Sequence, residues 1–592
     1  MLLYRGQKTC QFSPIRSFRR HKNQLTKHQK ELSCTNSGCL FCIMNEPDPS
    51  LRRSGLSRCF SRLHQHQVED DDDDLVITLT GLWKIALANP DDPEFPSLGI
   101  FDCMAKLIHK CIKGRKWFAR GNNVCIPYYA AHIIGSYTIN KERLAEIAVK
   151  SNVIPPLMEL MKGKFTWVEQ RVAVRALGHI ASHKSTFKSI AVHEEEIIHL
   201  AVKISSTCFD TVCREFLRLK VEERVGYHRD LMSRGQQYGG LEMENQKAEE
   251  WASQLQCWSL YLLNCFTVLR ISSIDLICKK DFLEELCDMW GGFQSISLFS
   301  GVCLIRSICL TKDGRRRIAS SRVVIEGLCN LSRSSDEWQR KAVESILLLL
   351  QDQETRAEVI DLVLPYMVDL VELKIVKGDR VANVGETITR LLLQDYGRIK
   401  FGQMALKKQK SQSALEEIWN LKVERIKRDD MISEEEFRER KIKVGLLKHQ
   451  GNQKFWAGDA EEAAEKYTEA LDLCPLKMKK ERIVLYSNRA QCYLLLTEAG
   501  LAISDATRAV CLSGSVRPHL KSLWRRSQAY DMLGMARHSL MDCLMFINHK
   551  TQFKTKRNIK VPYYAVRMLD KQINATKAVC ATSKSEQVGT KR

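Results

Sequence analysis

The chain has 592 residues, which is too long for one hydrophobic core and predicts three or four structural units. Its 44% hydrophobic and 27% charged residues are typical of a globular protein, and only 13 prolines and 30 glycines argue against long disordered or sandwich-like regions. Of the formal net charge of +21, +9 lies between Met1 and His66, and no recognised nucleic-acid motif accompanies it. We therefore expect an all-α repeat protein without a nucleic-acid partner.

The 22 cysteines fall mostly at apolar helix positions, as reduced cysteines do when they act as small hydrophobic residues. The sequence shows no secretory signal and no apolar run of membrane-spanning length. We therefore expect a reducing cytoplasmic setting, and a nuclear one also fits. The basic N-terminus, poor in acids, leaves an organellar transit peptide open.

Residues 1–74 read as a mostly disordered basic segment that ends in the acidic run EDDDDD. The segment contains a C-x4-C-x2-C cluster with a further cysteine beyond it, namely Cys34, Cys39, Cys42 and Cys59. One C-x2-C pair supplies half of a zinc site, but the other half has irregular spacing. We expect incidental thiols in a flexible tail, and a zinc-dependent or ubiquitin-pathway regulator remains the alternative.

Residues 75–400 show long apolar-periodic helices separated by short turns. The clearest unit, residues 151–204, divides into a helix after Pro155, a second helix through Leu177 and a third near its end. Its size and helix count are typical of an armadillo or HEAT repeat. The segments VIPPLMELM and AVRALGHIA resemble an armadillo repeat specifically, and weaker echoes follow in residues 300–332 and 341–373. We therefore expect an armadillo-like solenoid over 75–400.

Import receptors of the armadillo type bind peptides through repeated asparagine and tryptophan side chains. In this sequence His179 takes the place of that asparagine, and we expect it and His183 to be ordinary core or surface histidines. The polar stretch of residues 236–250 predicts a long loop. Because no phosphate loop, nucleophile elbow, HExxH or kinase signature occurs in the sequence, we expect no enzyme and no cofactor.

Residues 401–443 alternate in charge and predict an exposed connecting helix. Residues 444–577 contain a second kind of repeat. In its first unit, the spacing of small, aromatic and turn residues resembles that of a tetratricopeptide repeat (TPR), at Gly451, Ala463, Tyr467, Ala470 and Pro475. Ala490 and Ser527 stand where Gly451 stands, at intervals of 39 and 37 residues. We expect three TPR units, a capping helix over Tyr563–Gln572 and a disordered tail over 578–592.

Five polar side chains fall on the first helices of these three units: Lys448, Asn452, Asn488, Lys521 and Arg525. Their i, i+4 spacing puts each pair on one helix face, toward the groove that the repeats form. Cations and amide donors on three helices suit the two adjacent carboxylates of a C-terminal aspartate.

The set resembles the carboxylate clamp of heat-shock co-chaperones. The resemblance implies that the five residues bind the C-terminal Glu-Glu-Val-Asp tail of chaperones of the 90-kDa or 70-kDa class. The myosin-chaperone family combines the same two modules in the reverse order. We therefore expect a co-chaperone adaptor whose solenoid holds a client, and a scaffold that binds an unrelated acidic peptide is the alternative.

Overall fold

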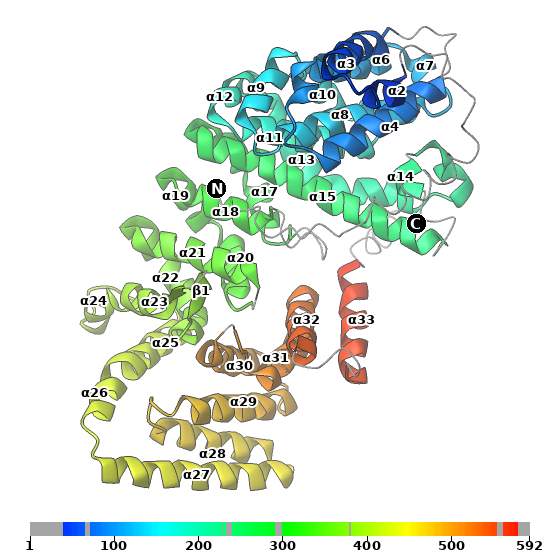
Figure 1. The fold of residues 1–592 in the computed structure, drawn as a ribbon. Helices are drawn as coiled ribbons and strands as arrows, with labels where there is room; N and C mark the ends of the chain where they lie inside the picture. The colour runs from blue at the N-terminus through cyan, green and yellow to red at the C-terminus, as the bar shows by residue number, and fades with distance from the viewer. Residues whose placement is uncertain are drawn as a thin grey trace, which may run out of the picture. The chain divides into compact units, whose positions relative to one another are not determined.

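The computed structural model of the chain describes residues 39–65, 72–227, 229–232, 240–290, 299–334, 336–377, 380–514, 516–552 and 561–577. These residues form helices joined by short turns, with one two-stranded hairpin, so the all-α prediction is confirmed (Figure 1). The chain divides into two compact units, residues 1–277 with 291–300 and residues 278–290 with 301–592. Among the described helices, none combines the length and the apolar content that crossing a bilayer requires.

The first unit is built from helices of very different length, the longest of which is α15. Their bounds are α2 Leu40–Met44, α3 Pro49–Leu63, α4 Asp72–Ala88, α5 Glu94–Ser97, α6 Ile100–Lys113, α7 Arg115–Phe118, η1 Asn123–Cys125, α8 Ile126–Thr138, α9 Glu142–Lys150, α10 Ile154–Met161, α11 Trp167–Ala181, α12 Lys184–Ala191, α13 Glu194–Val212, η2 Cys213–Leu217, η3 Val221–Gly226, α14 Arg229–Met232, α15 Gly240–Leu269, η4 Ile271–Ser273 and α16 Ile274–Ile277.

The core of the first unit lies where α11 packs between α8 and α15. Thr166 begins α11 with a capping box, because its hydroxyl accepts from the backbone of Val168 while Glu169 accepts from the backbone of Thr166. Prolines begin α10, as expected for a first helical turn. The predicted three-helix unit of residues 151–204 contains a further short helix, α12, between the second and third helices.

Two expectations for the first unit differ from the structure. Helices α2 and α3 lie in the segment that we expected to be mostly disordered, since Leu56 and Phe60 are buried and Asp48 caps α3. The described part of the polar stretch at 236–250 is the start of α15 and not a loop. One face of this start is buried: Arg224 donates to Asn245 at 2.9 Å, and Ala248 is inaccessible.

The second unit continues the helical pattern and contains the hairpin. The bounds of its elements are α17 Lys280–Glu285, α18 Gly301–Ile308, α19 Lys312–Ser320, α20 Arg322–Ser332, α21 Glu337–Gln351, α22 Gln353–Met367, η6 Val368–Leu370, β1 Ile375–Lys377, β2 Arg380–Ala382, α23 Val384–Leu393, α24 Tyr396–Lys400, α25 Gln409–Trp419, η7 Asn420–Glu424, α26 Arg425–Asp430, α27 Glu434–Trp456, α28 Ala460–Leu473, α29 Lys479–Leu495, α30 Ala499–Ser513, α31 Leu520–Met532, α32 Ala536–Gln552 and α33 Tyr563–Lys577. The two strands pair antiparallel, with Val376 opposite Val381.

The expected single connecting helix over 401–443 is wrong. This segment holds α25, a π-helical turn, α26 and the first ten residues of α27, which Ser433 caps by accepting from Glu436. The apolar side chains of α25 are buried against α22 and α23, so the segment packs onto the unit instead of standing in solvent. Arg425 extends this packing by donating to the backbone of Leu471 and Cys474.

Helices α27 to α32 form three consecutive antiparallel pairs, and α33 packs on α32 (Figure 1). Small residues allow the close packing within a pair: a Cβ on Gly451 of α27 would lie 2.8 Å from the ring of Tyr467 on α28. Small buried residues recur in the second and third pairs, where Ala490 and Ser527 are both inaccessible. The three pairs therefore repeat one packing rule.

Candidate peptide-binding site

The five residues that we expected to bind a carboxylate come from the first helix of each pair. Lys448 and Asn452 lie one turn apart on α27, Asn488 lies on α29, and Lys521 and Arg525 lie one turn apart on α31. Four of the five are partly buried, and Lys521 is exposed. The five residues therefore lie on the helices that the sequence indicates, namely α27, α29 and α31.

The two asparagines contact each other across α27 and α29. The Nδ2 of Asn488 donates to the Oδ1 of Asn452 at 3.5 Å, a long hydrogen bond, and the Tyr467 hydroxyl donates to the same oxygen at 2.7 Å. With its oxygen engaged in this way, Asn452 keeps both N–H donors of its amide for another acceptor. The network itself fixes this orientation of the amide.

Arg525 bridges α31 to α29. Its Nε donates to Gln491 at 3.0 Å, and its Nη1 donates to both the backbone oxygen and the hydroxyl of Ser487 at 2.6 Å. All these partners are neutral, and burial lowers the pKa of the guanidinium from its ordinary value. The side chain is thus held in one position, and no carboxylate of the described residues compensates its charge.

The two lysines differ in their surroundings. Lys448 forms an ion pair with Glu481 at the start of α29, with 2.7 Å between Nζ and Oε2. Lys521 is exposed and has no ion-pair partner among the described residues. The structure therefore links α27 to α29 through the asparagines and the Lys448–Glu481 pair, and α29 to α31 through Arg525.

Two further arginines support the site and escaped the sequence reasoning. Arg489, next to Asn488, forms two hydrogen bonds of 2.7 and 2.8 Å with Asp505 on α30. Arg526, next to Arg525, forms the same pair of bonds with Asp542 on α32. In these two repeats the acid follows the arginine by 16 residues, and this shared interval is a signal that the sequence contains. Each pair holds the first helix of its repeat against the second.

The candidate metal ligands of the N-terminal segment do not meet as a site in the described residues. Cys34 lies outside them, Cys39 begins α2, and Cys42 is exposed. Cys59 is buried in α3, and burial raises the pKa of its thiol to about 11. The described part of the chain holds no group of three or more side chains placed to bind a metal ion.

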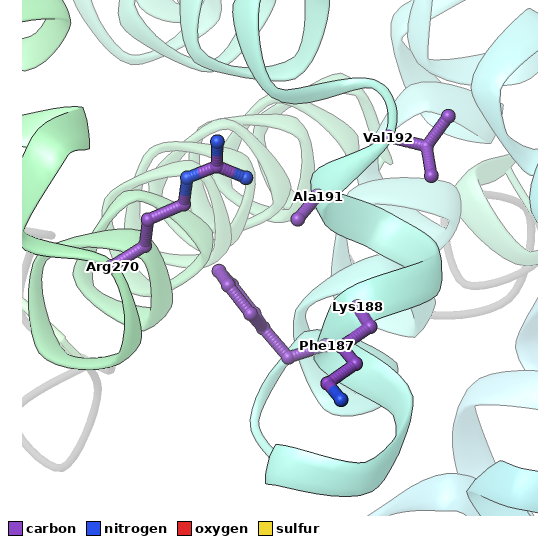
Figure 2. A pocket seen from close by; sticks show the side chains of 5 residues that line it. All are labelled: Phe187, Lys188, Ala191, Val192 and Arg270. Carbon is purple, nitrogen blue, oxygen red and sulfur yellow. The ribbon is translucent and has the colours of Figure 1, made fainter.

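Two other features of the first unit are a buried histidine and a surface hollow. His179 is buried with its ring 5.0 Å from that of Trp258, and burial lowers its pKa well below the ordinary value, so it is a neutral core side chain. An open hollow of about 410 Å³ is the second feature, and Figure 2 shows the side chains that line it, namely Phe187, Lys188, Ala191, Val192 and Arg270. Arg270 is already paired with Glu194 at 3.1 Å, so the hollow offers little to a charged ligand.

Comparison with known proteins places repeats of the armadillo type in this chain. The family model described as "Plant ARM repeat" matches residues 31–279. The chain is 39% identical over 88 residues to Protein unc-45 homolog B of Danio rerio, which covers 15% of this chain and 9% of that protein. It is 33% identical over 134 residues to Sperm-associated antigen 1A of Danio rerio, covering 22% and 29%. With the Mitochondrial import receptor subunit TOM70 of Rattus norvegicus it shares 35% over 95 residues, covering 16% and 15%.

The matched parts thus span less than a third of each of these relatives. Among solved structures, a designed armadillo repeat protein in complex with the peptide (KR)4 aligns with 13% identity and a TM-score of 0.33, covering 50% of this chain and 98% of that chain. Residues 31–279 therefore match armadillo-type repeats, and further helical pairs follow them along the chain.

Proposed function

We propose that α27 to α33 form a TPR domain whose five polar residues bind the C-terminal Glu-Glu-Val-Asp tail of heat-shock chaperones. On this proposal the chain is a non-enzymatic, cytoplasmic co-chaperone adaptor, and the armadillo-type domain holds a client. The observation that carries the proposal is the chain of contacts across three consecutive first helices, from Asn452 to Asn488 and from Arg525 back to Ser487.

The donors suit a doubly charged peptide end. Lys521 offers an exposed ammonium, Arg525 retains donors beyond those already in use, and the amide nitrogen of Asn452 points away from its engaged oxygen. Hydrogen bonds to charged groups are worth about 1.5–3 kcal/mol each. A micromolar peptide needs about 8 kcal/mol, so a few such bonds with apolar contacts are sufficient.

Preorganisation favours the same conclusion. The neutral partners of Arg525 fix its side chain without neutralising its charge, so little rotamer freedom is lost when a carboxylate arrives. The Arg489–Asp505 and Arg526–Asp542 pairs hold the backbone beneath the site. A groove fixed before the ligand arrives is what a short extended peptide requires.

The test is titration of the full-length protein with a fluorescent peptide that ends in Glu-Glu-Val-Asp. Lys521→Ala and Arg525→Ala should each weaken binding by about 10- to 150-fold, as the loss of one charged hydrogen bond implies. Lys466→Ala is the matched control, because Lys466 lies on the second helix of its pair and bonds only to Glu469 among the described residues. Unchanged dissociation constants in both site variants would refute the clamp.

The neutral contacts of Arg525 also fit the alternative of a scaffold that binds some unrelated acidic peptide, since any carboxylate would complement an uncompensated guanidinium. The two functions differ in what they require of the ligand. A clamp loses binding when the terminal aspartate is deleted or its carboxylate is amidated, whereas a groove that reads internal acids keeps it. The same titration with these two modified peptides therefore separates them.

A further inference from the structure

We propose that Glu481 is an intramolecular competitor for the ligand carboxylate, held on Lys448 until a chaperone tail displaces it. This inference rests on the proposed function of the same groove. It assigns to Glu481 a role in setting the affinity and the selectivity of the site.

The geometry of the pair motivates the assignment. Glu481 lies in the first turn of α29, and its Oε2 is 2.7 Å from the Nζ of Lys448 on α27. The Lys448 side chain is 29% exposed and the Glu481 side chain 36% exposed, so solvent reaches both groups. Ion pairs of this exposure are weak and easily exchanged for another partner. The ion pair between Lys448 and Glu481 can therefore break and re-form readily in solution.

Lys448 is distinguished from the other two cations by this carboxylate. Arg525 bonds only to neutral groups, and Lys521 has no ion pair among the described residues. Of the three cations, Lys448 alone is engaged by an acid of the chain within the described part. A tail carboxylate that approaches Lys448 meets the like charge of Glu481, so each carboxylate weakens the binding of the other to the ammonium.

Competition of this kind favours ligands that carry a full negative charge at this position. A neutral chain end cannot outcompete Glu481 for the ammonium, because it offers a weaker, uncharged acceptor. A free terminal carboxylate can do so, with help from the neighbouring donors of Asn452 and Asn488. Glu481 thus lowers the affinity of every ligand that binds through Lys448, and only a charged end can compete with it for the ammonium.

The experiment measures peptide affinity in full-length Glu481→Gln, which keeps the size and hydrogen-bonding capacity of the side chain and removes its charge. We expect binding of a Glu-Glu-Val-Asp peptide to strengthen by about two- to fivefold, the range that a half-exposed ion pair supports. In a Lys448→Ala background the same substitution should have no effect, because the competition acts through the ammonium. Glu469→Gln is the control, since Glu469 forms an equally short 2.7 Å pair with Lys466 on α28.

The outcomes separate this inference from the proposed function. If the parent protein binds the peptide and Glu481→Gln binds it with the same affinity, the competitor role is refuted while the clamp stands. Equal strengthening by Glu469→Gln would show an effect of net charge alone and would also refute the role. Failure of both the parent protein and Glu481→Gln to bind would overturn the inference together with the clamp.

Discussion

Asp369 lies in η6, directly after α22, and the loss of its side chain should weaken the second unit. Its carboxylate is inaccessible and contacts Arg333 at 2.6 Å, Arg508 at 2.8 Å and the hydroxyl of Ser504 at 2.5 Å. Arg508 and Ser504 belong to α30, and Arg333 follows α20, so one carboxylate joins helices from two parts of the unit. We predict that Asp369→Ala separates these helices.

The magnitude follows from burial. Removing one partner of a buried ion pair leaves the other charge without compensation and costs about 3–5 kcal/mol. Arg333 and Arg508 are both largely buried, with side chains 12% and 15% exposed. Arg508 keeps its bond to Glu417, which places the expected loss near the lower end of that range. Asp313→Ala is the control: the Asp313–Arg316 pair is exposed, and its removal should cost less than about 1 kcal/mol.

The same carboxylate predicts a dependence on pH. Burial raises the pKa of Asp369, but Arg333 and Arg508 outweigh this effect and hold the pKa below its ordinary value of 3.8. Because the folded pKa is depressed, the stabilisation is fully present above the unfolded pKa and is lost as the pH falls through the folded one. The unit should therefore lose this contribution only below about pH 4, and Asp369→Ala should be less sensitive to pH in that range.

The assay is urea unfolding followed by circular dichroism, with hydrogen exchange to locate the weakened helices. We expect Asp369→Ala to speed up amide exchange more in η6, α22 and α30 than in α27 and α28, because the first three elements meet at the carboxylate. A change in the free energy of unfolding below about 1 kcal/mol, or exchange that is raised equally everywhere, would refute the reasoning.

Two further changes test packing and charge in the helical pairs. Gly451→Ala places a Cβ about 3 Å from three carbons of the Tyr467 ring, so thermal and urea unfolding should show a loss of about 1–3 kcal/mol. Gly445→Ala on the same helix meets open space and should be neutral or stabilising, and equal effects at both glycines would contradict the packing. Burial, with Arg537 and Arg526 nearby, lowers the pKa of His538 to about 3. The unfolded chain therefore binds more protons between about pH 6.5 and 3, and acidification in this window should destabilise the parent by up to about 1.4 kcal/mol per pH unit, but His538→Gln less. Unfolding curves at pH 7 and 5 measure the difference, and parallel losses in the two proteins would show that His538 is charged when folded.

Sequence periodicity is sufficient to predict a helix that has one apolar face and turn residues at both ends. The second helix of the 151–204 unit begins where Thr166 and Glu169 make a capping box, and both residues are visible in the sequence. The polar sequence at the start of α15 predicts a loop, whereas the structure has a helix whose burial depends on Arg224. This arginine lies outside the stretch in sequence and contributes a contact only after folding. Tertiary contacts of this kind leave no local pattern.

In the candidate site, too, the sequence predicts some features and not others. Repeat spacing placed the five polar residues on the three first helices, since register alone decides which helix carries a residue. It did not indicate that Glu481 engages Lys448, or that Ser487 and Gln491 hold Arg525, because these partners lie on a neighbouring helix. Register predicts positions, whereas the rotamers that decide charge compensation depend on contacts between helices.

The helical pairs are not an independent module appended to the helices before them. Arg482, at the start of α29, is 1% exposed and forms hydrogen bonds of 3.0 and 2.5 Å with Glu372, far earlier in the chain. Asp369 holds Arg508 of α30 in the same manner, and Arg425 binds the end of α28. A fragment of residues 444–577 would expose Arg482 and Arg508, lose their acids Glu372 and Asp369, and lose Arg425 altogether. The same helix α29 carries Asn488 and Glu481, so cutting the chain at 444 would loosen the helix on which the candidate groove depends. A fragment that keeps these contacts must therefore begin before Asp369.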